Sequence, residues 1–310
     1  MDLKVSVIIP VLNREKLIER CLESIILQVR APYEIIVVDN GSEDNTINKI
    51  NSVFNQHLNK GINFKLLFEE KRGAVFARQK GLKFATGNYI SFFDSDDIMY
   101  PFLLEKVGKR INDNIDYDIF CWKCKINMLD GTQKIPHFST VSPLENHLVD
   151  TLLRTDGYIV KKSFIEDVGG WCKPLKVWND LELGLRLLNK KPRICYIKEV
   201  LVEIFSQVDS ITGENFSIKE GEWERTIMEM ENEADKFLPD VQKKIKILLS
   251  YKKIILSSLY RQEGNKEKAE KLYYSALINH SLKESWLLRF AYYYTLSGFR
   301  GAWRIIRFFL

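Results

Sequence analysis

The sequence lacks the features that would mark it as a disulfide-stabilised, zinc-binding or membrane-spanning protein. The stretch of residues 285–310, which is dense in Trp, Phe, Tyr and Leu, is interrupted by arginines and cannot supply the roughly 18 uncharged residues of a membrane span. Its five cysteines are scattered. Because Cys121 and Cys124 have no second pair and only four distant histidines accompany them, structural thiols are favoured over half a zinc site. No signal peptide is recognisable before the first expected strand, so we expect a cytoplasmic, reduced protein.

The glycine-rich loops that bind phosphates in many nucleotide-binding proteins are also absent. Pro10-Val-Leu-Asn-Arg stands where a G-x-G-x-x-G turn would follow the first strand, and no G-x-x-x-x-G-K-[ST] occurs. Phosphates are therefore not held by a glycine loop. The net charge of +5 is modest and gives no case for nucleic acid as a partner.

What is present is an ordinary globular composition, with 45% hydrophobic and 28% charged residues in a chain of 310. In the first half, apolar runs rich in Val, Ile and Phe alternate with segments of helical periodicity. Strands are predicted at 5–10, 34–39, 62–68 and 89–93, and helices at 14–28, 44–54 and 74–84. This alternation predicts an α/β fold, a doubly wound, mostly parallel sheet with helices on both faces.

Polar residues follow each predicted strand at the edge where such sheets bind ligands. Each stretch alone is a plausible turn, but their convergence on one edge favours a binding site. Asp94, Asp96 and Asp97 are the most informative, because two unit charges about 5 Å apart repel by roughly 3 kcal/mol at an effective dielectric near 20. A divalent cation makes that clustering tolerable, and hard carboxylate oxygens suit Mg²⁺ or Mn²⁺.

Four blocks in this order resemble glycosyltransferase family 2, whose members have the GT-A fold. They read "VSVIIPVLNREKLIERCLESIILQ", "EIIVVDNGSEDNT", "RGAVFARQKGLKFATGNYISFFDSDD" and "GGWCKPLKVWNDLELGLRLL". The resemblance covers about residues 5–205. It implies an inverting transfer of a sugar from a nucleotide-sugar to an acceptor hydroxyl. The base contact expected of Asp39 favours a UDP-sugar as the donor.

The resemblance also implies roles for individual residues on the donor side. Asp39 would accept a hydrogen bond from the nucleotide base, in a pocket lined by Pro10 and Asn13. Arg78 would approach the donor from the third helix. Asp94 and Ser95 would contact the ribose or sugar, while Asp96 and Asp97 would form the metal site, with Asp97 in a supporting part.

On the acceptor side, the resemblance makes Asp180 the general base. A positioned carboxylate is useful there, because a sugar hydroxyl is a poor nucleophile. The alternative is a helix N-terminal acid that stabilises the macrodipole by about 0.3–1 kcal/mol. Asn179 replaces an acidic residue that is usual in the family. Trp171 and Trp178 either stack on an acceptor sugar or are ordinary packed aromatics.

The composition changes after about residue 205, and we expect residues 1–210 and 211–310 to form a catalytic domain and a helical region. Helices are predicted at 218–237 and 241–262, and residues 259–278 resemble one tetratricopeptide-type hairpin. The helical region would pack on the catalytic domain or on a second subunit as a homodimer. Residues 285–310 either lie on an anionic membrane surface or close a helical core.

Two functions are consistent with the sequence. The first is a metal-dependent glycosyltransferase that uses Mn²⁺ or Mg²⁺ and extends a saccharide or lipid-linked saccharide. The second is a non-catalytic nucleotide-sugar binder or scaffold, which only Asn179 favours.

Overall fold

The computed structural model describes residues 3–111, 116–207, 216 and 221–308. A sheet of nine strands lies at its centre, in the order β3-β2-β1-β4-β8-β6-β9-β5, with β7 paired to β6. The strands are β1 (Val5–Val11), β2 (Glu34–Asp39), β3 (Asn63–Phe68), β4 (Tyr89–Phe92), β5 (Ile98–Met99), β6 (Ile119–Asn127), β7 (Gln133–Lys134), β8 (Tyr158–Lys161) and β9 (Ile194–Phe205).

The strands of the first half are parallel, as the sequence predicts. β1 lies between β2 and β4 in parallel register, and β3 extends this part beyond β2. The second half is mixed, because β8 runs antiparallel to both β4 and β6, whereas β6 and β9 are parallel. The prediction of an α/β fold is confirmed, and the antiparallel β8 is the feature that alternation along the chain did not reveal.

Helices cover both faces of the sheet. The helices of the N-terminal region are α1 (Ile18–Ile26), α2 (Thr46–Gln56), α3 (Ala74–Phe84), α4 (Leu103–Ile111), α5 (Pro143–Asp150), α6 (Lys162–Asp167) and α7 (Asn179–Asn189). α1, α2 and α4 pack on the face that carries Val7 and Ile9. α3, α6 and α7 pack on the opposite face, which carries Ile8, as expected from alternation along a strand.

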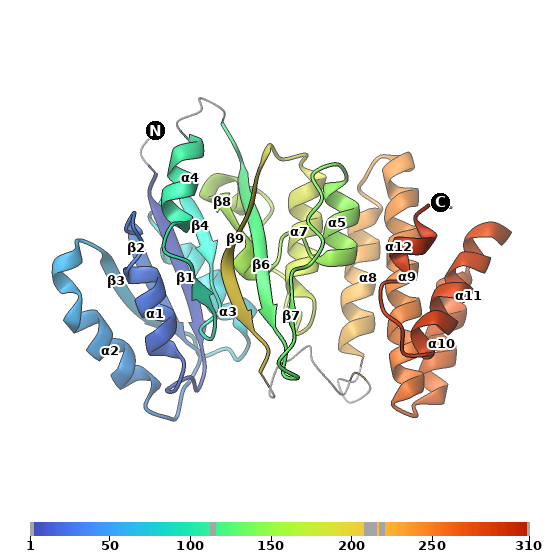
Figure 1. Cartoon of the computed structure of the whole chain (residues 1–310), viewed down its shortest axis with the longest axis horizontal. Coiled ribbons are helices and arrows are strands. Elements are labelled where there is room, and N and C mark those ends of the chain that lie inside the picture. The colour runs from blue at the N-terminus through green and yellow to red at the C-terminus, as the bar shows by residue number, and fades with distance from the viewer. Residues whose placement is uncertain (1–2, 112–115, 208–215, 217–220, 309–310) are drawn as a thin grey trace.

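The C-terminal helical region consists of α8 (Glu222–Ala234), α9 (Pro239–Gln262), α10 (Lys266–Leu277), α11 (Leu282–Leu296) and α12 (Trp303–Ile306). It lies beyond α5 and α7 at one end of the molecule (Figure 1). One apolar core joins these helices to α5 and α7, so the region packs on the N-terminal region of its own chain. The predicted hairpin is confirmed, since Asn265 caps α10 after the turn at Gly264.

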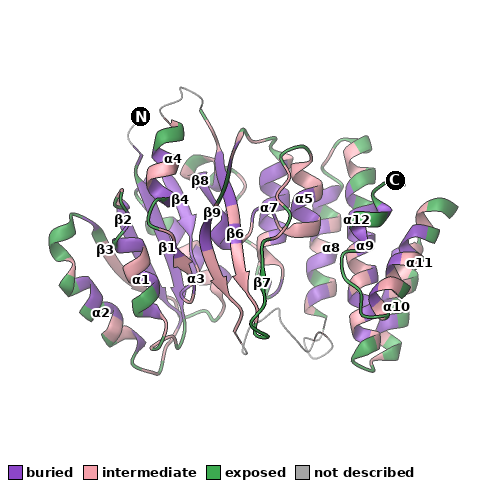
Figure 2. Ribbon diagram, in the orientation of Figure 1, coloured by how far each residue is buried: buried purple, intermediate pink, exposed green. Residues whose placement is uncertain are grey.

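Residues 285–310 contribute buried side chains to that core. Leu287 and Leu288 of α11 and Trp303 of α12 are among them, which agrees with the core-closing alternative. Other aromatic side chains of the same stretch stay exposed, and Figure 2 shows exposed residues along α10 and α11. Within the described part of the chain, no helix is long and apolar enough to cross a membrane.

Candidate active site

Asp39 ends β2 and shapes the turn that follows it. Its buried carboxylate accepts hydrogen bonds from the main-chain N–H groups of Gly41 and Ser42, at 3.1 Å each. Gly41 has φ +89°, a left-handed conformation that favours glycine. A carboxylate has about four acceptor positions, so Asp39 keeps capacity for a ring N–H of a base. Its predicted role as a base reader is compatible with this geometry and stays a prediction.

Asn13 ties the loop after β1 to the loop after β2. Its side-chain oxygen accepts from the N–H of Glu43 at 2.8 Å, and its own N–H donates to Oγ of Ser42 at 3.0 Å. Asn13 itself has φ +51° and is exposed at this edge. Pro10 is buried inside β1, opposite Val38 of β2. Hydrogen bonds therefore join the loops after β1 and β2 at the edge of the predicted base-binding pocket.

Three carboxyl groups meet after β4. Oxygen atoms of Asp94, Asp97 and Asp156 lie within 4.8 Å of one another, and they are the one such group among the described residues. The carboxylate of Asp156 accepts the main-chain N–H of Asp94 at 2.6 Å. Asp97 accepts the N–H of Phe205, the last residue of β9, at 2.9 Å. The acidic group is thus supported by three separate segments of the chain.

Electrostatics at this group suit a divalent cation. Burial, reinforced by neighbouring carboxylates, raises the pKa of Asp97 and the pKa of Asp156 well above the usual range. An all-oxygen donor set with excess negative charge is the kind that Mg²⁺ and Mn²⁺ occupy. The residues present therefore fit the expected metal.

Asp96 and Ser95 occupy other positions in the same loop. The carboxylate of Asp96 lies 3.9 Å from Nε of Arg14, and its carbonyl accepts from Nη2 of Arg20 at 2.6 Å. The side chain of Asp96 is therefore outside the three-carboxyl group. It belongs to the same loop and is 17% exposed. Ser95 is buried. Asp156, which sequence analysis missed, joins Asp94 and Asp97 in the group. The predicted role of Asp96 as a metal ligand stays a prediction.

Arg78 of α3 joins the acidic group to Trp171. Its Nη2 donates to Asp94 at 2.6 Å, and its guanidinium carbon lies 4.7 Å from the centre of the Trp171 ring. Trp171 is buried, with its ring edge-on to Phe92 at 5.2 Å. The expectation that Trp171 stacks on an acceptor sugar is thus corrected, because its ring is buried and already contacts Phe92 and the guanidinium group of Arg78. Trp171 instead holds Arg78 beside Asp94.

Asp180 lies in the first turn of α7 and faces the same group of charges. It is half-buried, and its Oδ1 accepts the N–H of Leu181 at 2.9 Å. Burial raises the pKa of Asp180, while the guanidinium groups of Arg154 and Arg78 oppose that rise and Asp94 adds to it. A carboxylate with a raised pKa is a stronger proton acceptor than an exposed one. Asp180 and Asp94 are therefore electrostatic neighbours, although 86 positions separate them in the sequence.

The residue before α7, Trp178, has φ +48°, which is unusual for an aromatic residue. The helical region holds it there. Trp223 of α8 packs edge-on against its ring at 4.7 Å, and Thr226 of α8 donates to the carbonyl of Val177 at 2.9 Å. Nζ of Lys252, from α9, lies 5.0 Å from the ring centre. Trp178 is only half-buried, so its predicted contact with the acceptor stays open.

Asn179 has a structural contact of its own. Its Nδ2 donates to the carbonyl of Leu175 at 3.3 Å, within the loop that leads to α7. The N-cap residue of α7 is Trp178, and no side chain makes a capping hydrogen bond there. An amide can donate to that carbonyl, whereas a carboxylate cannot. The change from the family's acidic residue is therefore accounted for locally.

Sequence reasoning missed Asp156, Arg154 and Lys252. Asp156 lies in the short 3-10 helix η2 (Thr155–Gly157), and its carbonyl accepts the indole N–H of Trp122 at 3.1 Å. Nothing in "RTDGY" distinguishes it from an ordinary turn. Lys252 is one of many lysines on α9. Only the tertiary structure shows that Asp156 joins Asp94 and Asp97, and that Arg154 and Lys252 interact electrostatically with the predicted base.

Comparison with known proteins gives the same family as the sequence motifs. The model of glycosyl transferase family 2 matches residues 6–159. The uncharacterized glycosyltransferase YibD of Escherichia coli (strain K12) is 34% identical over 114 residues, which are 36% of this chain and 32% of that protein. The UDP-Glc:alpha-D-GlcNAc-diphosphoundecaprenol beta-1,3-glucosyltransferase WfgD of Escherichia coli is 36% identical over 118 residues, 37% of this chain and 44% of that protein. The chain thus spans less than half the length of these relatives.

The similarity of the fold extends further than the similarity of the sequence. TarS of S. aureus, in the crystal structure of residues 1–349 with UDP-GlcNAc, superposes with a TM-score of 0.66 at 20% identity, covering 98% of this chain and 91% of that one. The mannosyltransferase PcManGT of Pyrobaculum calidifontis, in complex with GDP-Man and Mn²⁺, gives 0.59 at 18% identity, covering 97% and 82%. These likenesses show the GT-A fold. The match of residues 6–159 to the family model, together with the sequence motifs, places this chain in glycosyl transferase family 2.

Proposed function

We propose that this chain is an inverting, metal-dependent glycosyltransferase that moves a sugar from a UDP-sugar to a hydroxyl group of a saccharide or lipid-linked saccharide. The observation that carries the proposal is the placement of Asp180 beside the Arg78–Asp94 pair. This puts a proton acceptor close to the residues expected to bind the donor. The fold neighbours described above were crystallised with UDP-GlcNAc or with GDP-Man and Mn²⁺.

The reaction follows from these positions. Asp180 accepts the proton of the acceptor hydroxyl as its oxygen attacks the anomeric carbon of the donor sugar. The bond from that carbon to the diphosphate breaks, and its electron pair leaves with the nucleotide. Arg78 binds the negative charge that develops on the diphosphate, and Asp39 holds the base. Attack from the face opposite the leaving group inverts the anomeric centre.

Asp94 and Asp96, supported by Asp97 and Asp156, would hold the divalent cation. A bound Mn²⁺ or Mg²⁺ supplies positive charge that stabilises the leaving diphosphate. Burial and one main-chain hydrogen bond each keep two of these carboxyl groups oriented: the N–H of Asp94 donates to Asp156, and the N–H of Phe205 donates to Asp97. The side chain of Asp94 is 36% exposed, so it is the member of the group that can reach both a cation and the donor.

The alternative, a non-catalytic nucleotide-sugar binder, rested on Asn179. The side-chain amide of Asn179 donates a hydrogen bond to the carbonyl of Leu175, which explains an amide at this position on structural grounds. Asp180 is half-buried and has a raised pKa. Its one structural role among the described residues is to accept the N–H of Leu181 in the first turn of α7, which does not require a buried carboxylate. We therefore favour the enzyme.

Hydrolysis of a panel of UDP-, GDP- and ADP-sugars with Mn²⁺ tests the proposal. Water replaces the acceptor in this assay, so the acceptor need not be known. UDP-sugars should be hydrolysed fastest and ADP-sugars slowest, because uracil offers a ring N–H to Asp39 and adenine offers none. Binding of UDP without hydrolysis of any donor, alone or with mixed glycans, would support the scaffold instead.

A further inference from the structure

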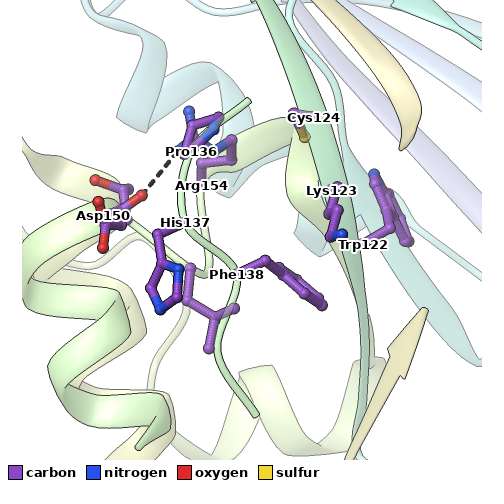
Figure 3. A pocket seen from close by; sticks show the side chains of 10 residues that line it. Trp122, Lys123, Cys124, Pro136, His137, Phe138, Asp150 and Arg154 are labelled. Carbon is purple, nitrogen blue, oxygen red and sulfur yellow. Dashed lines mark hydrogen bonds between the residues drawn. The ribbon is translucent and has the colours of Figure 1, made fainter. Parts of the chain in front are cut away.

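Two hollows lie near Asp180, and only one has room for an acceptor. The smaller, of about 10 Å³, lies between β6 and the segment that leads to α5. Figure 3 shows Arg154 beside Asp150 at this pocket, where its Nη2 donates to the carbonyl of Asp150 at 2.8 Å. A volume of this size admits about one water molecule. An acceptor sugar must bind elsewhere.

The larger hollow is a groove of about 1620 Å³ between the N-terminal region and the C-terminal helices. α5 and the β6–β7 hairpin form one side, and α9 and the segment from α11 to α12 form the other. Trp178 and Lys252 both line it. Since Asp180 follows Trp178 by two residues and interacts electrostatically with Lys252, this end of the groove lies next to the predicted base.

The groove carries more positive than negative charge. Its basic side chains are those of Lys134, Lys252, Arg300, Arg304 and Arg307, and its acidic ones are those of Asp130, Glu145 and Asp150. Glu145 is already engaged, since it pairs with Lys244 at 3.0 Å and accepts the indole N–H of Trp303 at 3.0 Å. This leaves a surplus of cationic groups along the groove.

Three of these cations make no close ion pair in the described part of the chain, although Asp130 interacts electrostatically with Arg300, and Asp150 and Asp180 with Lys252. Among the described residues, no carboxylate lies within 4.0 Å of the charged groups of Lys252, Arg300 or Arg304. Burial lowers the pKa of Lys252 to about 8, with Asp180 and Asp150 acting in the opposite direction, so its ammonium group is mostly charged near neutral pH. A half-buried cation without a close ion pair is stabilised when an anion binds beside it.

We propose that this groove binds the acceptor and that the acceptor carries phosphate groups, which contact Lys252, Arg300 and Arg304. The guanidinium fork binds two phosphate oxygens at once, and cations at both the Asp180 end and the α11–α12 end suit more than one phosphate. Lys252 is then a positioning residue that brings the acceptor to Asp180. The inference rests on the proposed function, because it assigns the acceptor of that reaction.

Binding of labelled probes to the protein saturated with UDP tests the inference, because UDP keeps them out of the nucleotide site. A glycerol-phosphate hexamer represents a soluble phosphodiester chain, and geranyl diphosphate represents a lipid-linked diphosphate. At least one should bind about tenfold or more tightly than maltohexaose, which is neutral, and hyaluronan oligosaccharide, which carries carboxylates. Whichever phosphate probe binds identifies the source of the phosphate.

Variants locate the binding. Lys252→Met keeps an unbranched side chain against Trp178, and Arg300→Gln with Arg304→Gln changes two exposed side chains. Each should weaken binding of the phosphate probe by about tenfold or more. A control, Lys271→Gln with Lys283→Gln, removes two exposed cations outside the groove and should bind the probe as the wild type does. UDP affinity and melting temperature show whether each variant is folded.

The inference is overturned if neither phosphate probe binds, if hyaluronan binds equally well, or if the arginine double variant binds like the wild type. Failure here is distinct from failure of the proposed function. A protein that hydrolyses UDP-sugar with Mn²⁺ but ignores both phosphate probes is a glycosyltransferase with another acceptor.

Discussion

Among single residues, Asp180 offers the clearest test of chemistry. Asp180→Asn keeps the size of the side chain and an oxygen that can accept the N–H of Leu181, but it removes the proton acceptor. We expect sugar transfer or hydrolysis to fall by about 10²–10⁴-fold, with UDP affinity and melting temperature nearly unchanged. Steady-state rates with UDP-sugar and Mn²⁺, alongside calorimetry with UDP, measure both effects.

Asp167→Asn on α6 is a matched control, because it is the same change at an exposed carboxylate away from the predicted donor residues. It should leave the rate at the wild-type level. An Asp180→Asn enzyme with near wild-type rate would show that Asp180 is only a helix N-terminal acid.

The acidic group predicts a second effect at this scale. Mn²⁺ should increase UDP affinity, and both Asp94→Asn and Asp96→Ala should abolish that increase, because each removes one of the more accessible carboxylates at the loop. Titration calorimetry with UDP in Mn²⁺ and in EDTA measures it. Glu70→Gln, an exposed acid after β3, is the control. Equal wild-type affinity in Mn²⁺ and EDTA would rule out the metal.

Among the elements, the contact between α5 and α7 is unusually close. A Cβ on Gly184 of α7 would lie 2.2 Å from Nε2 of His147 on α5, so only glycine allows this approach. His147 is fully buried; its Nε2 lies 2.9 Å from the carbonyl of Leu181, and its Nδ1 accepts the N–H of Leu153 at 3.2 Å. Both bonds are satisfied by a neutral ring that carries its proton on Nε2. The contact therefore links the helix of Asp180 to its neighbour through an uncharged histidine.

A pH dependence of stability follows from this contact. Burial lowers the pKa of His147 to about 4, against about 6.5 in an unfolded chain. Between these values the unfolded state binds more protons, so stability is lost as the pH falls through that window. From pH 7 to pH 5 the histidine should cost about 2 kcal/mol of the free energy of unfolding.

Urea unfolding of the wild type and of His147→Gln at both pH values isolates this contribution. The comparison is needed because the raised pKa values of Asp97, Asp156 and Asp180 act with the opposite sign as the pH falls. The two proteins should differ less at pH 5 than at pH 7. The same difference at both pH values would contradict a buried neutral ring.

At the scale of the whole molecule, the helical region has a side that packs on the rest of the chain and also exposes apolar side chains. Its inner side packs on α5 and α7 and holds Trp178 in its left-handed conformation. Elsewhere the region exposes aromatic residues, among them Trp286 at 66% and Phe308 at 77%. Arginines lie in the same stretch. This combination is typical of surfaces that meet anionic lipid head groups.

We therefore expect the protein to bind vesicles that contain anionic lipid, and Trp286→Ser with Phe308→Ser to weaken that binding. Flotation with and without anionic lipid measures it. Leu58→Ser with Phe102→Ser changes two exposed apolar residues of the N-terminal region and serves as the control. If the wild type instead sediments as a dimer that the aromatic variant dissociates, a second copy of the chain covers this surface.

Much of the fold was predictable because its signals are local. The apolar runs and helical periods placed β1 to β4 and α1 to α3, and α3 has the predicted bounds, Ala74–Phe84. The strand-end motifs correctly gathered Asp39 and Asp94 at one edge of the sheet, since parallel strands end together. The antiparallel insertion of β8 had no local signal, because a short apolar strand reads the same in either direction.

The sequence by itself determined the family and the sheet edge at which the predicted donor-side residues lie, because these depend on short motifs and on the order of elements. Tertiary structure decided which side chains approach one another across long intervals. Asp156 lies with Asp94 and Asp97, Trp171 is buried in the core, and Lys252 of the helical region interacts electrostatically with the predicted base. Those outcomes depend on packing between segments distant in the chain, and no residue spacing encodes such packing.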